Sequence, residues 1–329
     1  MTTATYSLIG DIGGTNARFA LVRAGEVTPE AVAVLACSDY GNIGSAISDY
    51  LRGAGTNAAQ VQGACLAVAA TPASGTRVKM TNNHWRFDRE EVRSQFGWTF
   101  FKVINDFTAM ALGIPHVAPG KQIHVCGGPG DASQPRLVIG PGTGLGVSCL
   151  MPSNNGWNAL MTEGGHVNFA PTDDTEMALL NILKGRFGRV SVERILSGQG
   201  LLNLYQAHSI LQNVAAPLDF PKDITAAALA DADSLAGQAL AHFCEILGRV
   251  AGNAVLTLGS TGGVYLCGGM LPQFSDFFLN SPFQKGFEDK GRMRPMLEST
   301  PVYMVTESYT GLLGAAQWLI RGNEPVQSC

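Results

Sequence analysis

A glycine-rich turn between two apolar segments is the first place in this chain where residue types suggest chemistry. The turn follows Asp11 and contains four residues suited to binding phosphate: Gly13, Gly14, Thr15 and Asn16. Glycines permit a tight turn whose backbone N–H groups are open to a phosphate oxygen. Asp11, at the end of an apolar strand, could hold Mg²⁺ directly or through water. A plain β-hairpin explains the same residues, and the two interpretations are compatible because the site would be built on that hairpin.

The pattern occurs a second time at residues 137–150, where the turn contains Gly142, Thr143 and Gly144. Gly14-Thr15 aligns with Gly142-Thr143 in the two copies. Two such turns facing each other could bind a polyphosphate from both sides. No Walker A motif occurs, and neither turn is followed directly by a helix, as a dinucleotide-binding motif would require. The repeat therefore indicates a duplicated fold with one phosphate-binding hairpin in each half.

Two polar residues, Asn105 and Asp106, follow the apolar segment 100–104. A strand is predicted to meet a helix there, which is the usual position of functional residues in α/β folds. Helix capping would explain one such residue, whereas two in succession favour a functional role. A carboxylate at this position could accept the proton of a substrate hydroxyl during phosphoryl transfer.

A second group of polar residues comes from the latter half of the chain. Glu163 and His166 flank two glycines that would leave room for a ligand, although a surface turn is equally consistent. One Glu and one His are too few ligands for a structural metal site. Glu193 is predicted to lie in the first turn of a helix beginning at Ser191, where the helix dipole alone would favour a carboxylate.

Gly268 and Gly269 follow a buried strand and fit either a ligand contact or tight packing. Together, the two turns, an aspartate at a strand end and the further acids indicate a kinase for a polyhydroxylated substrate. Each hydroxyl of such a substrate needs a polar partner once water is removed.

Strands and helices alternate along the chain, as in an α/β fold. The patterns predict strands at 6–12, 17–23, 31–37, 61–69, 76–81, 100–104, 137–140, 145–151, 156–161, 263–267 and 301–305. They predict helices at 42–53, 88–96, 106–113, 233–258 and 308–320, one beginning after Asp173 with Met177 on its apolar face, and one beginning at Ser191. No Pro/Ser-rich linker separates the halves, so the domain boundary is predicted to be a hinge near residue 114.

The composition favours a compact globular protein: 46% of the 329 residues are apolar and 15% are charged. A net charge of −4 gives no electrostatic support for a nucleic-acid or membrane-surface partner. The seven cysteines form no C-x-x-C pair and mostly lie in apolar segments, which predicts buried free thiols. No signal segment or membrane-length apolar span is present. The expectation is a cytoplasmic protein.

The motifs in combination resemble those of the bacterial ATP-dependent glucokinases, a family of the actin/hexokinase/Hsp70-like superfamily, over essentially the whole chain. The matching segments are Gly10–Arg18, Met80-Thr81-Asn82 with Trp85, 104–109, 142–146, 163–167, 193–198 and 287–292. The resemblance implies a duplicated ribonuclease-H-like (actin-like ATPase) fold with an active-site cleft between two domains. The small domain would comprise 1–114 and 307–329, and the large domain 115–306.

The resemblance also implies roles for individual residues. It makes Asp106 the general base for the sugar 6-hydroxyl and assigns the other hydroxyls to Asn105, Glu163, His166 and Glu193, which overrides the local interpretation of Glu193. The turns at 11–16 and 142–146 would bind the phosphates of ATP. Asp11 would lie near Mg²⁺, and Gly268-Gly269 would lie against the adenosine. The implied enzyme is a homodimer that converts glucose and ATP to glucose 6-phosphate and ADP for glycolysis.

Two departures from the family pattern are Met161-Thr162, where Pro-Gly is frequent, and Pro141, where a smaller residue is usual. A kinase for another hexose or an N-acetylhexosamine is an alternative, although the zinc-type cysteine cluster usual in that branch is missing. A sugar-sensing repressor would need a DNA-binding segment before Leu8, and a chaperone-like ATPase would lack Asn105-Asp106. A phosphoryl donor other than ATP remains open, because such turns recognise only phosphate.

Overall fold

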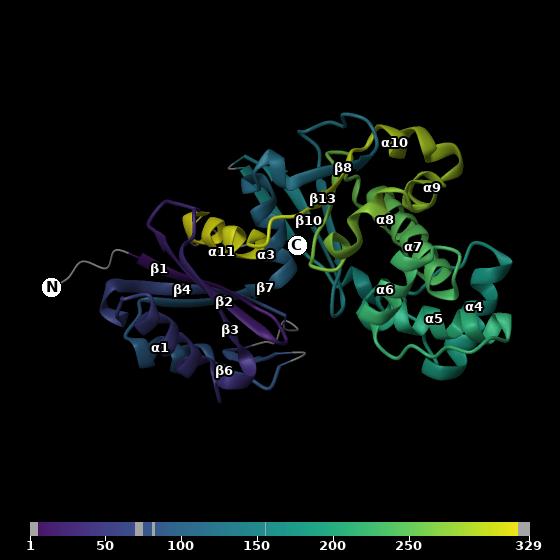
Figure 1. The fold of residues 1–329 in the computed structure, drawn as a ribbon. Coiled ribbons are helices and arrows are strands. Elements are labelled where there is room, and N and C mark those ends of the chain that lie inside the picture. The colour runs from purple at the N-terminus through teal and green to yellow at the C-terminus, as the bar shows by residue number, and fades with distance from the viewer. Residues whose placement is uncertain (1–5, 70–74, 81–82, 155, 322–329) are drawn as a thin grey trace. The chain divides into compact units, whose positions relative to one another are not determined.

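The computed structural model describes residues 6–69, 75–80, 83–154 and 156–321. Contacts between residues divide it into two compact units (Figure 1). The first unit comprises the described residues within 1–119, 153–161 and 307–329, and the second comprises those within 120–152 and 162–306.

The first unit is built on a five-stranded sheet whose order is β3-β2-β1-β4-β7. Its strands are β1 (Tyr6–Ile12), β2 (Asn16–Arg23), β3 (Glu30–Ala36), β4 (Val61–Val68) and β7 (Phe100–Asn105). The first three form an antiparallel meander, and β4 and β7 run parallel to β1. In this register Asp11 is opposite Ala67, and Ala67 is opposite Ile104. The parallel strands therefore end together, which brings the residues that follow β1 and β7 to one edge of the sheet.

The connections in this unit are helices with clear sequence signals. The helix α1 (Ile43–Gly53) is capped by Asn42. The helix α2 (Arg89–Phe96) is capped by Asp88, which accepts from the N–H groups of Glu90 and Glu91. The small sheet of β5 (Arg77–Lys79) and β6 (Arg86–Asp88) precedes α2. The strand β11 (Gly156–Met161) also belongs to this unit, where its Asn158 accepts a hydrogen bond from Arg321.

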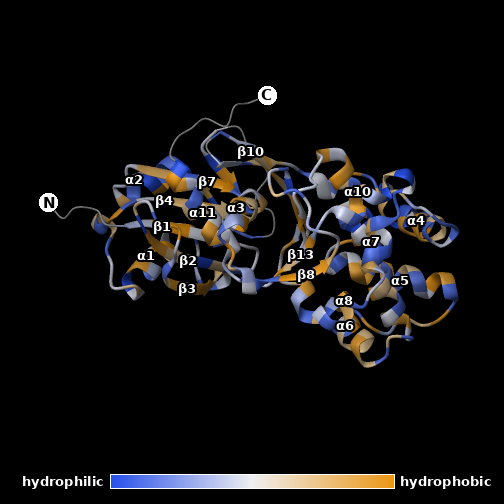
Figure 2. Cartoon of the chain, turned by 90° about the horizontal axis from the view of Figure 1, so that it is seen from above, coloured by the Kyte–Doolittle hydropathy of each residue, from blue (hydrophilic) through white to orange (hydrophobic). Residues whose placement is uncertain are grey.

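Both faces of this sheet are buried, because successive residues of a strand point to opposite sides. One face packs mainly on Leu8, Phe19, Ile47, Leu66, Trp85 and Phe101. The other packs on Ile9, Ala20, Val22, Cys65, Leu312, Ala315 and Ala316. Figure 2 shows the hydrophobic residues of β7 in orange.

The helices α3 (Asp106–Gly113) and α11 (Thr310–Arg321) lie side by side (Figure 1), although they come from distant parts of the chain. Their backbones approach closely because glycines stand at the contacts. A Cβ atom added to Gly314 would lie 1.7 Å from the Ala109 carbonyl oxygen, and one added to Gly113 would lie 2.1 Å from the Thr310 carbonyl oxygen. The chain end thus contributes a helix to the same unit as β1.

The second unit repeats the strand arrangement of the first. Its strands are β8 (Gln122–Cys126), β9 (Arg136–Pro141), β10 (Leu145–Ser153), β12 (Val264–Leu266) and β13 (Val302–Val305). Within the unit their order is β10-β9-β12-β13-β8, with β9 and β10 forming an antiparallel hairpin and β12 and β13 parallel to β9. The first unit has the same arrangement in β2-β1-β4-β7, so the predicted duplication is confirmed.

The rest of the second unit is largely helical, and its long helix α7 (Leu235–Leu258) contacts β9 of the sheet. The other helices are α4 (Asp174–Phe187), α5 (Gly198–Gln212), α6 (Pro221–Ala230), α8 (Ser275–Leu279), α9 (Phe283–Glu288) and α10 (Arg294–Ser299). The long helix α7 supplies the centre of the core with Leu240, Phe243 and Leu247, as its periodicity predicts.

Two predictions in this unit are wrong. Met177, predicted on the buried face of α4, is 51% exposed. The helix expected from Ser191 is only the 3₁₀ turn η6 (Val192–Arg194). The Ser191 side chain makes no cap, and the N–H of Val192 pairs instead with the carbonyl oxygen of Val167. The next α-helix begins at Gly198, where Ser197 accepts a hydrogen bond from Gly200.

The six described cysteines are buried free thiols, in line with the prediction from the sequence, while Cys329 lies outside the described residues.

Where the chain is described, no helix combines the length and the apolar character needed to cross a membrane.

Candidate active site

The first glycine turn joins β1 to β2 and is fixed from several sides. The N–H of Gly13 donates to the Asn16 carbonyl oxygen (2.9 Å), and Asn83 Nδ2 donates to the Gly13 carbonyl oxygen (3.2 Å). The N–H of Cys37, after β3, donates to the Thr15 carbonyl oxygen (2.8 Å). Gly14 is partly exposed and Thr15 is exposed. The turn is thus held in place while its outer surface stays open to a ligand.

Asp11 lies just before this turn in an unusual electrostatic setting. Burial raises the pKa of Asp11 to about 6, with a smaller opposing effect of Arg18 and a further raising effect of the Asp106 carboxylate. The Arg18 guanidinium lies 3.5 Å from the Asp11 carboxylate, and the Asp11 side chain is 17% exposed. Arg18 is therefore the partner of a largely buried carboxylate, a role that the sequence patterns did not indicate. Its position opposite Asp11 in the β1–β2 register was the signal that could have revealed it.

Asn105 and Asp106 lie at the start of α3, at the same edge of the sheet as Asp11. Asn105 Oδ1 accepts a hydrogen bond from the Thr108 N–H (3.0 Å), so its capping role is real. Asp106 Oδ1 accepts from the Phe107 N–H (2.9 Å), and Asp106 is partly exposed. The structure therefore brings the Asp106 carboxylate close enough to Asp11 to help raise the pKa of Asp11.

The second glycine turn, in the second unit, joins β9 to β10. The N–H of Gly142 donates to the Gly144 carbonyl oxygen, and the N–H of Gly198, in the first turn of α5, donates to the Gly142 carbonyl oxygen, both at 2.8 Å. Thr143 is exposed between them. The turn is thereby fixed to the beginning of α5.

Gly268 and Gly269 follow β12 beside this hairpin. Gly268 has a positive φ of 98°, and a Cβ atom there would lie 3.0 Å from the Pro141 carbonyl oxygen. Gly269 is exposed, and a Cβ atom added to it would have no heavy atom within 4 Å. The backbones of β9 and β12 can approach here because Gly140 has no side chain. A Cβ atom added to Gly140 would lie only 1.9 Å from the Cys267 carbonyl oxygen.

Glu163, His166 and Glu193 converge next to the second turn. His166 lies in the 3₁₀ helix η5 (Gly164–His166), with Nδ1 3.9 Å from Glu193 Oε1 and Nε2 4.0 Å from Glu163 Oε2. Glu193 Oε2 accepts a hydrogen bond from the Leu145 N–H (2.9 Å). A Cβ atom at Gly144 would lie 2.4 Å from that oxygen, so the glycine leaves room for the carboxylate. The expected helix-dipole role of Glu193 is therefore wrong.

The loop before His166 is tied to β10. Thr162 Oγ1 donates to the Val147 carbonyl oxygen (2.7 Å) and accepts from the Gly164 N–H (3.3 Å). A Cβ atom at Gly165 would lie 2.2 Å from the Leu145 carbonyl oxygen, so the loop backbone packs directly on the strand. Thr162 and Asn83 are both positioning residues that the sequence patterns did not single out for these contacts.

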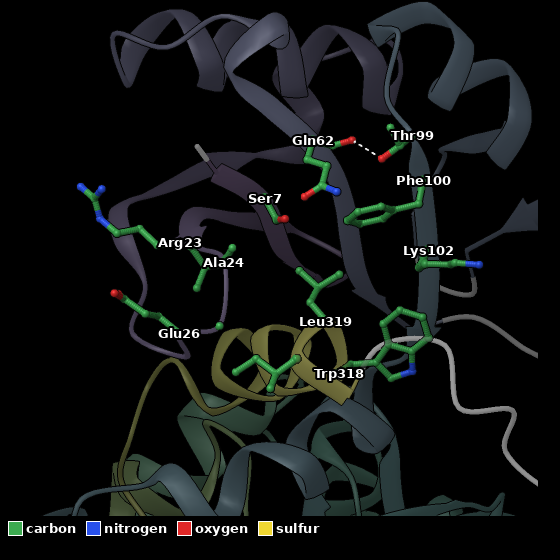
Figure 3. Close-up of a pocket in the computed structure, with 13 residues that line it drawn as sticks. Ser7, Arg23, Ala24, Glu26, Gln62, Thr99, Phe100, Lys102, Trp318 and Leu319 are labelled. Atoms are coloured by element: carbon green, nitrogen blue, oxygen red, sulfur yellow. Dashed lines mark hydrogen bonds between the residues drawn. The ribbon is translucent and has the colours of Figure 1, made fainter. Parts of the chain in front are cut away.

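Other observations bear on the predicted motifs. Thr81 and Asn82 lie outside the described residues, whereas Trp85 is buried and donates from Nε1 to the Tyr40 carbonyl oxygen (3.0 Å). A cavity of about 380 Å³ in the first unit is lined by residues including Ser7, Arg23, Gln62, Lys102 and Trp318 (Figure 3). It lies where β1, β4 and β7 begin, at the opposite edge from Asp11 and Asp106.

A family model for glucokinase matches residues 8–321 of the chain. The glucokinase of Marinobacter nauticus is 67% identical over 326 residues, covering 99% of this chain and 100% of the relative. That of Hahella chejuensis is 54% identical, covering 97% of this chain and 98% of the relative.

The crystal structure of a glucokinase from an Antarctic psychrotroph aligns with a TM-score of 0.85 at 33% identity, covering 96% of this chain and 99% of that one. A ROK-family glucokinase from Streptomyces griseus shares the fold, with a TM-score of 0.63 at 18% identity over 95% of this chain and 98% of that one. With a full-length relative at 67% identity and a family model over nearly its whole length, this chain belongs to the glucokinase family.

Proposed function

We propose that this chain transfers the γ-phosphoryl group of ATP to the 6-hydroxyl of glucose, giving glucose 6-phosphate and ADP for glycolysis. The observation that carries the proposal is the convergence of Glu163, His166 and Glu193 beside a glycine turn in a member of the glucokinase family. Carboxylate and imidazole groups at this spacing suit a sugar, since each of its hydroxyls needs a partner when water is excluded.

Asp106 is the general base of the proposed reaction. Its carboxylate would accept the proton of the 6-hydroxyl as that oxygen attacks the γ-phosphorus, the role of a catalytic aspartate in phosphoryl transfer. Asn105 would contact another hydroxyl through its amide nitrogen, because its Oδ1 already caps α3. Glu163, His166 and Glu193 would bind the remaining hydroxyls.

The two glycine turns are the proposed phosphate sites. Gly13, Gly14, Thr15 and Asn16 would bind the β- and γ-phosphates, and Gly142, Thr143 and Gly144 the phosphate nearer the nucleoside. Gly268 and Gly269 would lie against the adenosine. Backbone N–H groups in such turns bind anions without needing a charged side chain.

Asp11 is the proposed Mg²⁺ residue. Over the described ranges, no group of three or more His, Cys, Asp or Glu side chains is arranged to hold a metal ion. Mg²⁺ bound with ATP does not need such a cage, because one or two carboxylates, phosphate oxygens and water complete its octahedral shell. A single partly exposed carboxylate at the end of β1 fits that requirement. The bound ion would neutralise charge on the phosphates.

We further propose a cytoplasmic homodimer, on the family resemblance and the buried free thiols. Size-exclusion chromatography with light scattering would test the dimer directly, and a monomer at the assay concentration would contradict it.

A coupled assay over a panel of hexoses and phosphoryl donors tests the function. We expect ATP with glucose to give the highest kcat/KM. Equal kcat/KM values for glucose, mannose and N-acetylglucosamine would overturn glucose specificity, and comparable rates with ADP or polyphosphate would overturn the ATP assignment.

A further inference from the structure

A buried ionic network lies in the second unit, apart from the residues proposed to bind sugar. Its centre is Glu176 on α4, whose side chain has no exposed surface. Glu176 Oε1 pairs with Arg249 and lies 3.2 Å from His242 Nε2, both on α7. A buried carboxylate stays ionised only when it is paired. Burial by itself would raise the pKa of Glu176, but hydrogen bonds from His242 and Thr172 and the charge of Arg249 outweigh burial and lower the pKa to about 2.

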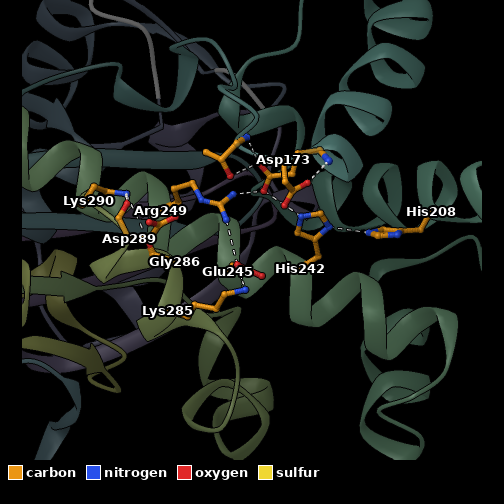
Figure 4. Close-up of polar contacts among 11 residues, drawn as sticks. Asp173, His208, His242, Glu245, Arg249, Lys285, Gly286, Asp289 and Lys290 are labelled. Atoms are coloured by element: carbon orange, nitrogen blue, oxygen red, sulfur yellow. Dashed lines mark hydrogen bonds and ion pairs between the residues drawn. The ribbon is translucent and has the colours of Figure 1, made fainter. Parts of the chain in front are cut away.

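The network extends through His242 to His208 and through Arg249 to Glu245 and Lys285 (Figure 4). His242 Nδ1 lies 3.0 Å from His208 Nε2 on α5. Arg249 Nη2 donates to Glu245 Oε1 at 3.2 Å, and that carboxylate also pairs with Lys285 at 3.0 Å. The contacts tie α4, α5 and α7 together, so the position of the Glu176 carboxylate is fixed by three helices.

The second carboxylate oxygen of Glu176 faces the loop that leads to α4. Glu176 Oε2 accepts hydrogen bonds from the Thr172 N–H (2.7 Å) and from Thr172 Oγ1 (3.1 Å). Thr172 ends the segment that begins with η5 and therefore carries His166. Hydrogen bonds to a charged acceptor are roughly twice as strong as those between neutral groups.

The same segment is fixed along its middle by other contacts. The Phe169 N–H donates to the Val190 carbonyl oxygen (3.0 Å), and Arg189 Nε donates to Asn168 Oδ1 (2.8 Å). These contacts come from the residues just before η6, which carries Glu193. The Thr172–Glu176 pair is thus the anchor at the α4 end of a segment that connects the helical core to His166.

We propose that Glu176 is a positioning residue for the sugar site: by holding Thr172 it sets the path of the segment that presents Glu163 and His166 to glucose. The inference rests on the sugar-binding role proposed above for those two residues. It explains why a carboxylate and its partners are kept in the core, where an apolar cluster of the same volume would be expected to be as stable.

Two double variants isolate the anchor. Glu176→Gln with Arg249→Met keeps an acceptor oxygen for Thr172, whereas Glu176→Leu with Arg249→Met fills the same space without one. Neither leaves Arg249 as an unpaired buried charge. We expect the Leu variant to have a KM for glucose about tenfold above that of the Gln variant, equivalent to about 1.4 kcal/mol, with the same KM for ATP.

Ser234→Ala controls for general destabilisation of α7. It removes the Ser234 cap on the Gly237 N–H (3.1 Å) and should lower the Tm without changing the KM for glucose. If the Leu double variant does not fold, Thr172→Val removes only the hydroxyl bond and should raise the KM for glucose about threefold.

Equal glucose KM values in the two double variants, or an unchanged KM in Thr172→Val, would overturn the positioning role. Glu163→Gln and His166→Ala separate this failure from a failure of the proposed sugar site. If they raise the KM for glucose while the Glu176 variants do not, only the positioning inference is wrong. If they leave it unchanged, the sugar site is wrong and the inference falls with it.

Discussion

Three of the carboxylates predicted to be functional, two in the first unit and one in the second, are held in three different ways. Asp11 is mostly buried beside Arg18 and Asp106. Asp106 is in the first turn of α3, with one oxygen on a backbone N–H. Glu193 has one oxygen on the Leu145 N–H, which leaves the other facing His166. A fixed oxygen restricts the side chain to one rotamer, so a ligand loses less entropy in ordering it.

Replacing the proposed base tests the chemical step at this scale. Asp106→Ala removes the proton acceptor, so we expect kcat to fall by about 10²–10⁴-fold. The residue does not belong to either glycine turn, so ATP affinity should stay within a few-fold of the parent. Rapid-quench turnover and a calorimetric ATP titration measure the two quantities. Substantial remaining turnover would show that Asp106 is not the base.

Replacing Asp11 should separate stability from activity. Its pKa is about 6 in the folded chain against 3.8 as the reference value. A raised pKa in an acid means that the folded state binds the proton more tightly, so stability from this group is full below pH 4 and is lost as the pH rises through 6. Asp11→Asn should therefore raise the unfolding free energy at pH 8, by up to about 3 kcal/mol, and not at pH 4. Activity should fall, because Asn carries no charge for Mg²⁺.

Urea unfolding at pH 4 and pH 8 measures this change in stability. Asp49 provides a control for which the stability change at pH 8 is expected to have the opposite sign. Hydrogen bonds from Tyr40 and Arg52 hold the pKa of Asp49 below its ordinary range. Asp49→Asn should thus lose stability at pH 8 rather than gain it. If Asp11→Asn were less stable than the parent at pH 8, the desolvated setting inferred for Asp11 would be wrong.

At the scale of elements, the hairpin of β9 and β10 uses its glycines for different purposes. Gly140 lies within the strand, where the Cys267 backbone leaves no room for a Cβ atom. Gly142 lies in the turn, where a Cβ atom would have no heavy atom within 4 Å. The first glycine therefore serves packing, and the second leaves space where phosphate is proposed to bind.

Alanine at each position distinguishes these roles. Gly140→Ala forces β9 and β12 apart and should lower the unfolding free energy by about 1–3 kcal/mol. Gly142→Ala should change it by less than about 0.5 kcal/mol but raise the KM for ATP several-fold, because the methyl group occupies the proposed phosphate space. Thermal unfolding and steady-state kinetics measure the pair. An unchanged KM for ATP in Gly142→Ala would argue against a phosphate at this turn.

Elements with local signals could be predicted from the sequence, and those defined by distant contacts could not. The helix at 106–113 has the predicted bounds, because Asn105 caps it and the apolar segment before Asn105 marks the end of the preceding strand. The turn after Ser191 is defined by distant partners: the Val192 N–H pairs with the Val167 carbonyl oxygen, and the Glu193 carboxylate accepts from the Leu145 N–H.

The residues predicted to be functional also differ in whether their roles could be predicted from local sequence or depend on distant contacts. The glycine turns and the carboxylates were visible as residue patterns, because their chemistry lies in residue types and short spacings. The contacts of Arg18, Asn83 and Thr162 were not predicted, since each depends on a partner in another strand or loop. The network around Glu176 joins residues up to 73 positions apart, and a single sequence carries no signal for such a pairing.

At the scale of the whole molecule, duplication gives each unit its own hydrophobic core. Leu312 of α11 packs with Ile9 and Cys65 in the first unit. Leu247 of α7 packs in the large core of the second, which shares no residue with the cluster around Leu312. The first unit is therefore not a continuous stretch of sequence, since the helix α11 from the end of the described chain completes the core around β1.

This separation of cores predicts local effects from matched core variants. Leu312→Ala and Leu247→Ala each remove a fully buried side chain and should cost about 2–5 kcal/mol. In hydrogen exchange, Leu312→Ala should reduce the protection of β1, β4 and α3 while β9, β12 and α7 keep theirs, and Leu247→Ala should give the reverse. Both variants make the same change from leucine to alanine. A difference in which segments lose hydrogen-exchange protection can therefore come only from which core each leucine stabilises. Equal loss of protection throughout the chain in both variants would mean that the two units unfold as one cooperative body, and Leu312 would then stabilise the second unit as much as the first.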